Sequence, residues 1–309
     1  MRIGINGSSL IATGAPLKQM VDHVVEAEAH GFSSYWLAQL GVPDTLTAIA
    51  AMGARTETIE IGTAVVPTWL RHPLMLASQA LTVQEAIGNR LTLGIGLAHK
   101  APIEATLGIP FDRPATHMEQ FLDVLLPAVS QRSVDASGDI WSAHVPTFAG
   151  MPGATPPSVM LAAMGPRMLA LAGARTDGLI LWLSGPRTIE SMLKPAVDAA
   201  AAAAGRPVPR IVASVPVCVT NRGDDVRNLI ATFLAGYNDL PSYRGVMDVE
   251  GVDGPAGVSI VGTESEVRAG IAAFAEAGAT DFAAVELTTD DDEQRTTRAL
   301  LKELARTTR

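Results

Sequence analysis

Strand-like apolar runs alternate with helix-like segments along almost the whole chain. The apolar runs are short and rich in Val, Ile and Leu, and they lie at 2–6, 33–37, 59–66, 91–97, 159–163, 178–183, 210–219 and 281–287. Segments with helical periodicity lie at 17–30, 44–55, 73–87, 116–131, 166–174, 186–204, 224–238 and 264–277. This alternation predicts parallel strands with helices outside them. Eight such units in 309 residues fit a closed α/β barrel, the eight-stranded (β/α)8 TIM barrel, better than an open sheet.

The composition suits such a barrel and narrows the functions open to it. Hydrophobic residues make up 48% of the chain and aromatic residues 5%, so aliphatic side chains must fill the core. The net charge is −9 and no basic run occurs, which argues against nucleic acid or an anionic membrane as a partner. No secretory signal pattern and no membrane-spanning stretch is visible. We therefore expect a cytoplasmic protein that acts on a small molecule.

Three insertion segments interrupt the alternation. A Pro- and Gly-rich loop is expected at 100–113, a short hairpin or lid at 139–157, and a polar, glycine-rich excursion at 242–259. Insertions on a barrel commonly carry substrate specificity, although the sequence does not assign a role to these. No boundary resembles a linker, so we expect a single domain over 1–309.

The single cysteine, Cys218, lies inside an apolar run and is expected to be a buried thiol. One cysteine cannot form an intrachain disulfide, and it argues against a zinc site. No metal site is predicted.

The carboxyl ends of the strands are where α/β proteins bind ligands, and here they carry small, apolar or neutral polar residues. These residues are Asn6, Ser8, Gln39, Ala64, Val65, Val66, Leu97, Ala98, His99, Ala163, Met164, Gly165, Pro166, Trp182 and Thr288. They contain no Ser–His–Asp set, no paired carboxylates and no lysine for a Schiff base. Such a rim suits a large planar cofactor that brings its own chemistry.

Glycines in the third and fourth runs allow two interpretations. Gly62, Gly94 and Gly96, together with Thr63 and Ala64, leave room for a flat ligand to approach the backbone. Alternatively, the glycines only permit tight packing of the barrel. Because two adjacent strands share the feature, we favour the floor of a cofactor site.

His99 is the one titratable group among these strand-end residues. Imidazole titrates near neutral pH, so His99 is the candidate for proton transfer, and the alternative is a solvated loop residue. His72, directly before Pro73, is expected to cap or pack at a helix start. His117 is expected on the outer face of its helix or against the substrate.

A second candidate feature is the junction where a strand ending in small residues runs directly into a helix at Pro166 and Arg167. The free N–H groups of that helix start would bind a phosphate, with charge added by Arg167. An ordinary strand–helix turn is the alternative.

Five segments carry a further signal through their order and spacing. They are A-E-A-H-G-F-S-S-Y-W-L-A-Q (27–39), I-G-T-A-V-V-P-T-W-L-R-H-P (61–73), R-L-T-L-G-I-G-L-A-H (90–99), V-M-L-A-A-M-G-P-R-M-L-A-L-A-G (159–173) and A-R-T-D-G (174–178). Together they resemble the bacterial luciferase-like superfamily, and within it the actinobacterial oxidoreductases that use coenzyme F420, a deazaflavin. The resemblance implies an eight-stranded α/β barrel that transfers a hydride between F420 and a small organic substrate.

The resemblance also implies roles for individual residues. It places a non-proline cis peptide bond between Ala64 and Val65, behind the central ring of the cofactor. It assigns cofactor contacts to Gln39, Ala64, Val65, Leu97, Ala98 and His99, with Ala163, Met164 and Gly165 holding the phosphate. From their places at the strand ends and the helix start, we expect Asn6, Thr63, Val66 and Pro166 to bind the cofactor as well. The acidic residue with a following His and the catalytic Glu that some relatives carry near positions 39 and 97–99 are missing here. Sugar-phosphate dehydrogenase activity is therefore not expected, and the substrate stays open.

Two alternatives stand beside this hypothesis. A monooxygenase of the same superfamily would use FMN and activate oxygen, and a noncatalytic protein would only bind F420 or a flavin. The resemblance further implies a homodimer, for which we expect the apolar faces 46–52 and 74–81 to form the contact.

Overall fold

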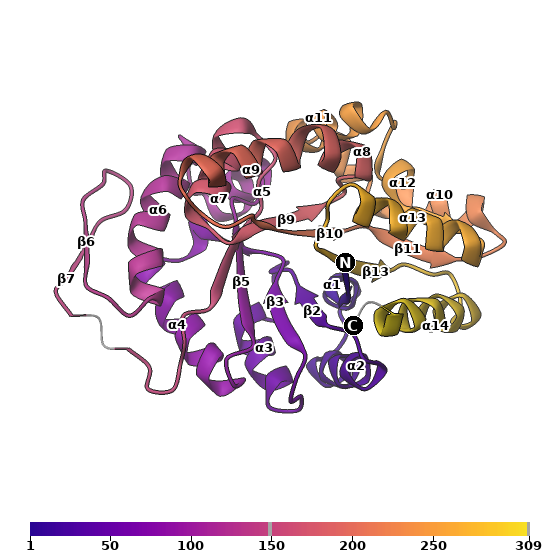
Figure 1. Cartoon of the computed structure of the whole chain (residues 1–309), viewed down its shortest axis with the longest axis horizontal. Coiled ribbons are helices and arrows are strands. Elements are labelled where there is room, and N and C mark those ends of the chain that lie inside the picture. Colours follow the sequence, from indigo (N-terminus) through magenta and orange to yellow (C-terminus); the bar gives the residue numbers. More distant parts are fainter. Residues whose placement is uncertain (148–149, 308–309) are drawn as a thin grey trace.

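The computed structural model describes residues 1–147 and 150–307. Eight parallel strands form a closed barrel in which the last strand pairs with the first (Figure 1). In spatial order they are β1 (Arg2–Asn6), β2 (Ser34–Leu37), β3 (Glu60–Thr63), β5 (Leu91–Gly96), β8 (Ser158–Leu161), β9 (Gly178–Trp182), β10 (Arg210–Ser214) and β13 (Asp281–Glu286). The predicted TIM barrel is confirmed.

The helices that follow these strands cover the outside of the barrel (Figure 1). They are α2 (Leu17–His30), α3 (Thr45–Gly53), α4 (Pro73–Ala86), α6 (Pro114–Val129), α7 (Pro166–Arg175), α9 (Lys194–Ala203), α13 (Glu264–Glu276) and α14 (Asp291–Thr307). The remaining helical elements are α1 (Ser8–Ala12), η1 (Thr68–Leu70), α5 (Lys100–Leu107), α8 (Pro186–Thr188), η2 (Ile189–Leu193), α10 (Gly223–Phe233), η3 (Ala235–Tyr237), α11 (Pro241–Glu250) and α12 (Pro255–Val258). Among the described residues, no helix combines the length and the apolar content that a bilayer span requires.

Two predicted strands are interrupted. The third run divides at its cis peptide bond into β3 and β4 (Val66–Pro67), and β4 pairs with β5. The seventh run divides after β10, and its continuation β11 (Pro216–Val219) pairs with β13 and with β12 (Ile260–Gly262). The sequence pattern did not predict β12, because only three residues form it.

Several helices were missed by the sequence pattern. Charged residues dominate the terminal helix α14. Its few buried apolar residues, Leu300, Leu301 and Ala305, therefore form no clear helical pattern in the sequence. The expected loop at 100–113 contains α5, and the expected excursion at 242–259 contains most of α11 and all of α12. The expected hairpin at 139–157 begins earlier, with β6 (Val134–Ala136) paired to β7 (Ala143–Val145), and its residues 148–149 lie outside the described ranges.

Side chains from five strands fill the barrel interior. Trp36, Met160, Ile180, Val212 and Ala283 form one buried cluster that is separate from the core under the helices. This plug makes the barrel a packed core with no channel through it.

The glycines of the third and fourth runs make room for this plug. A Cβ atom on Gly62 would lie 2.3 Å from the indole of Trp36, and one on Gly94 would lie 2.0 Å from the carbonyl oxygen of Thr63. The space beside Gly96 is also filled, because a Cβ atom there would lie 2.7 Å from Cγ2 of Val65. The interpretation of these glycines as room for a ligand is therefore wrong, and close packing is their role.

A charged network closes the amino-terminal end of the barrel. Arg210 donates to Glu60 at 3.1 Å and to Asp281 at 2.9 Å, and Arg2 donates to Asp281 at 2.7 Å. Burial disfavours the charged form of Asp281, but Arg210 and Arg2 outweigh it and hold the pKa of Asp281 below its usual range. The opposite end, at the carboxyl ends of the strands, is where α/β barrels bind their ligands.

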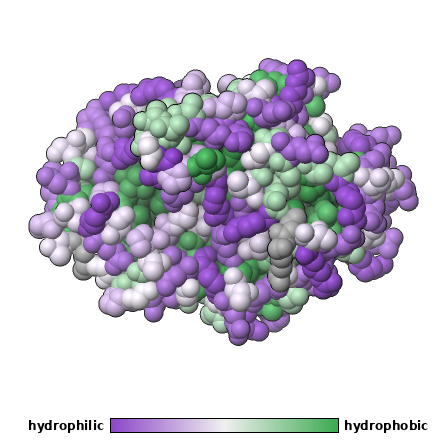
Figure 2. All heavy atoms as spheres, in the orientation of Figure 1, coloured by the Kyte–Doolittle hydropathy of each residue, from purple (hydrophilic) through white to green (hydrophobic). Residues whose placement is uncertain are grey.

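The helix faces expected to form a dimer contact are mostly buried within the chain. Leu46, Ile49 and Met52 of α3 and Leu76 and Leu81 of α4 are at most 2% exposed. These five side chains pack within the chain, whereas Met75 of the face 74–81 is 59% exposed, so the homodimer stays a prediction. The face of the molecule seen in Figure 1 is mostly hydrophilic, with apolar residues in separate groups (Figure 2).

Candidate functional site

A small apolar floor lies at the carboxyl end of β3. The peptide bond between Ala64 and Val65 is cis, which confirms the prediction for this position. The amide of Ala64 donates to the carbonyl of Leu37 at 2.7 Å, and the carbonyl of Val65 accepts from the amide of Gln39 at 3.1 Å. Both residues are half-buried and pack on the interior plug, directly after the carboxyl end of β3.

Two neighbours that the sequence assigned to cofactor contact support this floor from below. Thr63 and Val66 are each 0% exposed. The Thr63 hydroxyl donates to the carbonyl of Gly94 at 2.7 Å and accepts from its amide at 2.8 Å, tying β3 to β5. Because no solvent reaches either residue, neither can contact a ligand in this conformation, and their assignment as contacts is corrected.

Gln39 and Asn6 use their amide groups within the protein. The Gln39 side chain accepts from the amide of Thr45 at 2.9 Å and donates to the carbonyl of Gly41 at 2.7 Å, so it holds the loop after β2. Asn6 is 6% exposed and donates to the hydroxyl of Ser214 at 3.0 Å. Both amide groups are therefore engaged within the protein, where they shape the rim.

The tail of β5 brings His99 into the mouth. Leu97, Ala98 and His99 are half-buried, and Ala98 has a left-handed backbone with φ of 55°, which only a minority of non-glycine residues adopt. His99 lies edge-on to Tyr243 at 5.6 Å and to Tyr237 at 6.0 Å between ring centroids. Burial lowers the pKa of His99, so its imidazole is neutral at pH 7 and can accept a proton. The alternative of a solvated loop residue does not fit this environment.

An open helix start lies beside the floor. Ala163 is buried, Met164 is half-buried, and Gly165 and Pro166 are exposed where α7 begins. No side chain caps this helix, and a Cβ atom on Gly165 would meet nothing within 4 Å. The unpaired N–H groups of the first turn, with Arg167 exposed next to them, fit a phosphate group. The residues present therefore suit a cofactor with an apolar ring and a phosphate.

Sequence reasoning missed Tyr237 and Tyr243, which complete the mouth together with Trp182. They come from η3 and α11, and the only signal in the sequence was a pair of aromatic residues within a polar stretch. The Trp182 and Tyr237 rings lie 6.4 Å apart, and the Tyr237 and Tyr243 rings lie 4.7 Å apart.

Two other histidines are placed by the structure. The ring nitrogen Nδ1 of His72 accepts from the amide of Leu74 at 3.2 Å, which confirms the capping role. His117 is 0% exposed and stacks on Trp69 at 3.6 Å, so its placement on an outer face is wrong.

The single cysteine, Cys218, is a buried thiol, as expected. Its burial raises the pKa of the thiol to about 12.

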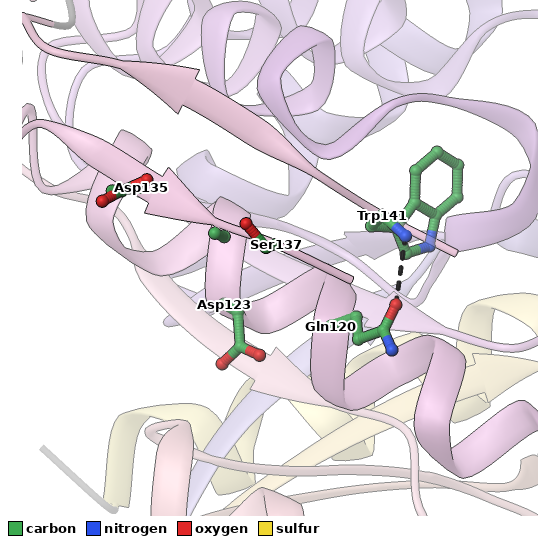
Figure 3. Close-up of a pocket in the computed structure, with 6 residues that line it drawn as sticks. Gln120, Asp123, Asp135, Ser137 and Trp141 are labelled. Atoms are coloured by element: carbon green, nitrogen blue, oxygen red, sulfur yellow. Dashed lines mark hydrogen bonds between the residues drawn. The ribbon is translucent and has the colours of Figure 1, made fainter. Parts of the chain in front are cut away.

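Two cavities lie away from the mouth. One of about 330 Å³ opens between α6 and the β6–β7 hairpin, where Gln120 accepts a hydrogen bond from the amide of Trp141 at 3.1 Å (Figure 3). A second of about 250 Å³ lies at the starts of α10 and α13. None of the sequence-predicted site residues lines either cavity. Across residues 1–147 and 150–307, no cluster of three His, Cys, Asp or Glu side chains could hold a metal.

The chain is thus an α/β barrel with an apolar floor at the carboxyl ends of its strands, next to an open helix start. The chain belongs to the luciferase-like monooxygenase family, whose model matches residues 2–281.

Known relatives of this chain include reductases. A 5,10-methylenetetrahydromethanopterin reductase of Methanolobus tindarius is 25% identical over 254 residues, covering 80% of this chain and 75% of that protein. The coenzyme F420 dependent tetrahydromethanopterin reductase of Methanopyrus kandleri superposes with a TM-score of 0.80 at 18% identity, covering 98% of this chain and 97% of that one.

A solved monooxygenase has the same fold. The oxygenating constituent of 3,6-diketocamphane monooxygenase of Pseudomonas putida, in complex with FMN, has a TM-score of 0.77 at 18% identity. The superposition covers 98% of this chain and 97% of the monooxygenase chain. The fold therefore occurs in a protein described as coenzyme F420 dependent and in one solved with FMN.

Proposed function

We propose that this protein is an oxidoreductase that uses coenzyme F420 to transfer a hydride to or from a small organic substrate. The observation that carries the proposal is the apolar floor of Ala64 and Val65 beside the open start of α7. The named F420-dependent and reductase relatives support the choice of cofactor. When bound, the deazaflavin would supply the carbon that gives or takes the hydride.

The residues of the chain would hold and shield that cofactor. Ala64, Val65, Leu97 and Ala98 would lie against its ring system, and the segment 163–166 would hold its phosphate at the start of α7. These contacts would orient the cofactor and exclude water from one face. His99 is neutral at pH 7 and is placed to take a proton from the substrate or return one.

An FMN-dependent monooxygenase is the second candidate. The floor and the helix start would accept the ring and phosphate of FMN as well as those of F420. The Pseudomonas putida neighbour binds FMN, which keeps this candidate open.

We further propose a cytoplasmic homodimer, built on an apolar surface next to the mouth. This surface consists of Leu40, Val42, Leu70 and Met75, which are 55%, 91%, 40% and 59% exposed. The ion pair between Asp44 and Arg71 brings its two segments together. An apolar surface of this kind is a liability on a monomer, and a second copy would cover it.

Turnover of a substrate panel tests the function. The visible absorbance of oxidised F420 should fall when the protein oxidises a suitable alcohol, and that of reduced F420 should rise when it reduces a suitable carbonyl or alkene. His99→Ala should then lower kcat by about 10²–10⁴-fold and leave cofactor affinity nearly unchanged. Tight F420 binding with no turnover of any panel member would favour a noncatalytic binding protein, and FMN-dependent oxygen consumption would favour the monooxygenase.

A further inference from the structure

Two polar side chains at the barrel mouth lack partners. Tyr243 is only 8% exposed, and its ring centroid lies 5.6 Å from that of His99. Within residues 1–147 and 150–307, neither the Tyr243 hydroxyl nor either ring nitrogen of His99 forms a hydrogen bond. Buried polar groups are rarely left unpaired, because water or a ligand normally satisfies them.

These atoms are also not sealed from solvent. Among the described residues, the side-chain atoms that are both sealed and unpaired belong to His30, Trp69, Ser184 and Asp198. The Tyr243 hydroxyl and the His99 nitrogens are unpaired but are not in that set, so each of them keeps some accessible surface.

The surroundings of the pair are apolar and uncharged. Tyr237 packs on Tyr243 at 4.7 Å, and Trp182 and Met164 belong to the same cluster. Burial raises the pKa of Tyr243 and lowers that of His99, so both are neutral at pH 7. An ionic substrate would therefore find no countercharge on these residues, while a flat apolar body would pack well.

We propose that Tyr243 and His99 together bind the oxygen of a neutral substrate, a carbonyl or hydroxyl group on an otherwise apolar molecule. Tyr243 donates a hydrogen bond to that oxygen, and His99 lies on its other side. Trp182, Tyr237 and Met164 hold the apolar body. The proposal rests on the proposed function and names the substrate class of the same mouth. It also assigns a role to the segment 242–259, which carries Tyr243 to the site.

The test compares two probes of the same shape that differ in one atom group. Acetophenone carries a carbonyl oxygen where α-methylstyrene carries a methylene group. Their affinities are measured by ligand-observed NMR titration of the purified full chain. The wild type should bind acetophenone more tightly, and Tyr243→Phe should weaken acetophenone about tenfold while leaving α-methylstyrene unchanged.

Two further variants complete the experiment. Tyr35→Phe removes a hydroxyl that pairs with His23 on the outside of the barrel, and it should keep the wild-type preference. His99→Ala lies on a different element from Tyr243 and should also weaken acetophenone alone, which preserves the test if Tyr243→Phe does not fold. The proposal is overturned if the wild type binds both probes equally well. It is also overturned if both Tyr243→Phe and His99→Ala keep the wild-type preference for acetophenone.

Parallel titration with F420 and FMN separates this proposal from the proposed function. Cofactor binding without an oxygen preference overturns the substrate proposal alone. An oxygen preference that depends on Tyr243, in a protein that binds neither cofactor, supports the oxygen site and overturns the proposed function.

Discussion

The indole Nε1 of Trp141 donates a hydrogen bond to Nδ1 of His117 at 3.2 Å. Because Nδ1 accepts, the proton of this imidazole lies on Nε2, which donates to the hydroxyl of Thr68 at 2.9 Å. Thr68 in turn donates to the carbonyl of Gly96 at 3.3 Å. The chain of contacts ties the segment after β6 to the end of β5, beside the mouth.

Acid should weaken the fold through His117. Burial lowers the pKa of His117 to about 4, whereas an exposed histidine titrates near 6.5. The unfolded chain therefore binds the proton first, so the stabilisation is complete above about pH 6.5 and is lost as pH falls towards 4. The loss should approach about 1.4 kcal/mol per pH unit in the middle of this window. Urea unfolding of the wild type and His117→Asn at several pH values checks this, and parallel stability curves for the two proteins would contradict it.

Filling the space at Gly62 should destabilise the barrel. A Cβ there would lie 2.3 Å from the indole of Trp36, so Gly62→Ala should cost about 1–3 kcal/mol or more through overpacking. Gly245→Ala is the matched control, since it lies within α11 and its Cβ would meet nothing within 4 Å. That substitution should instead raise stability by about 0.5–1 kcal/mol. The free energy of unfolding in urea measures both changes, and equal effects would contradict the packing role.

Much of the barrel could be predicted from the sequence because strand and helix periodicity are local. The glycines show the limit of that reasoning. The space beside Gly62 looks the same in sequence whether a ligand or Trp36 fills it, and only the fold decides between them. Tyr243 could not be placed for a related reason: it meets His99 only because α11 folds back over the mouth. Helix α14 was missed because its apolar residues are few among many charges.

Breaking the charged network at the amino-terminal end should destabilise the fold without changing the site. Asp281 is 2% exposed and pairs with Arg2 and Arg210. Both arginines keep Glu60 as a partner and are partly exposed, so the main cost of Asp281→Asn is the lost charge-assisted hydrogen bonds, about 1–3 kcal/mol. Asp224→Asn, at a fully exposed carboxylate, should leave the stability nearly unchanged. Thermal unfolding compares the two variants. A small effect of Asp281→Asn would show that water already screens the network.

Placing a charge on the apolar surface next to the mouth should separate a dimer. Met75 is 59% exposed, and Met75→Glu should put an unpaired charge into the proposed contact. Sedimentation at micromolar concentration should give about twice the chain mass of 32.3 kDa for the wild type and the chain mass for the variant. Glu104→Gln, on α5, is a control that should stay dimeric. A monomeric wild type would rule out the homodimer.

Titration of the purified chain with F420 and with FMN tests the central claim most directly. The floor of Ala64 and Val65 and the open start of α7 should hold the ring and phosphate of either cofactor, and the reductase relatives favour the deazaflavin. Fluorescence quenching should therefore show saturable binding of F420 with a lower Kd than for FMN. A lower Kd for FMN, or no saturable binding of either cofactor, would contradict the account.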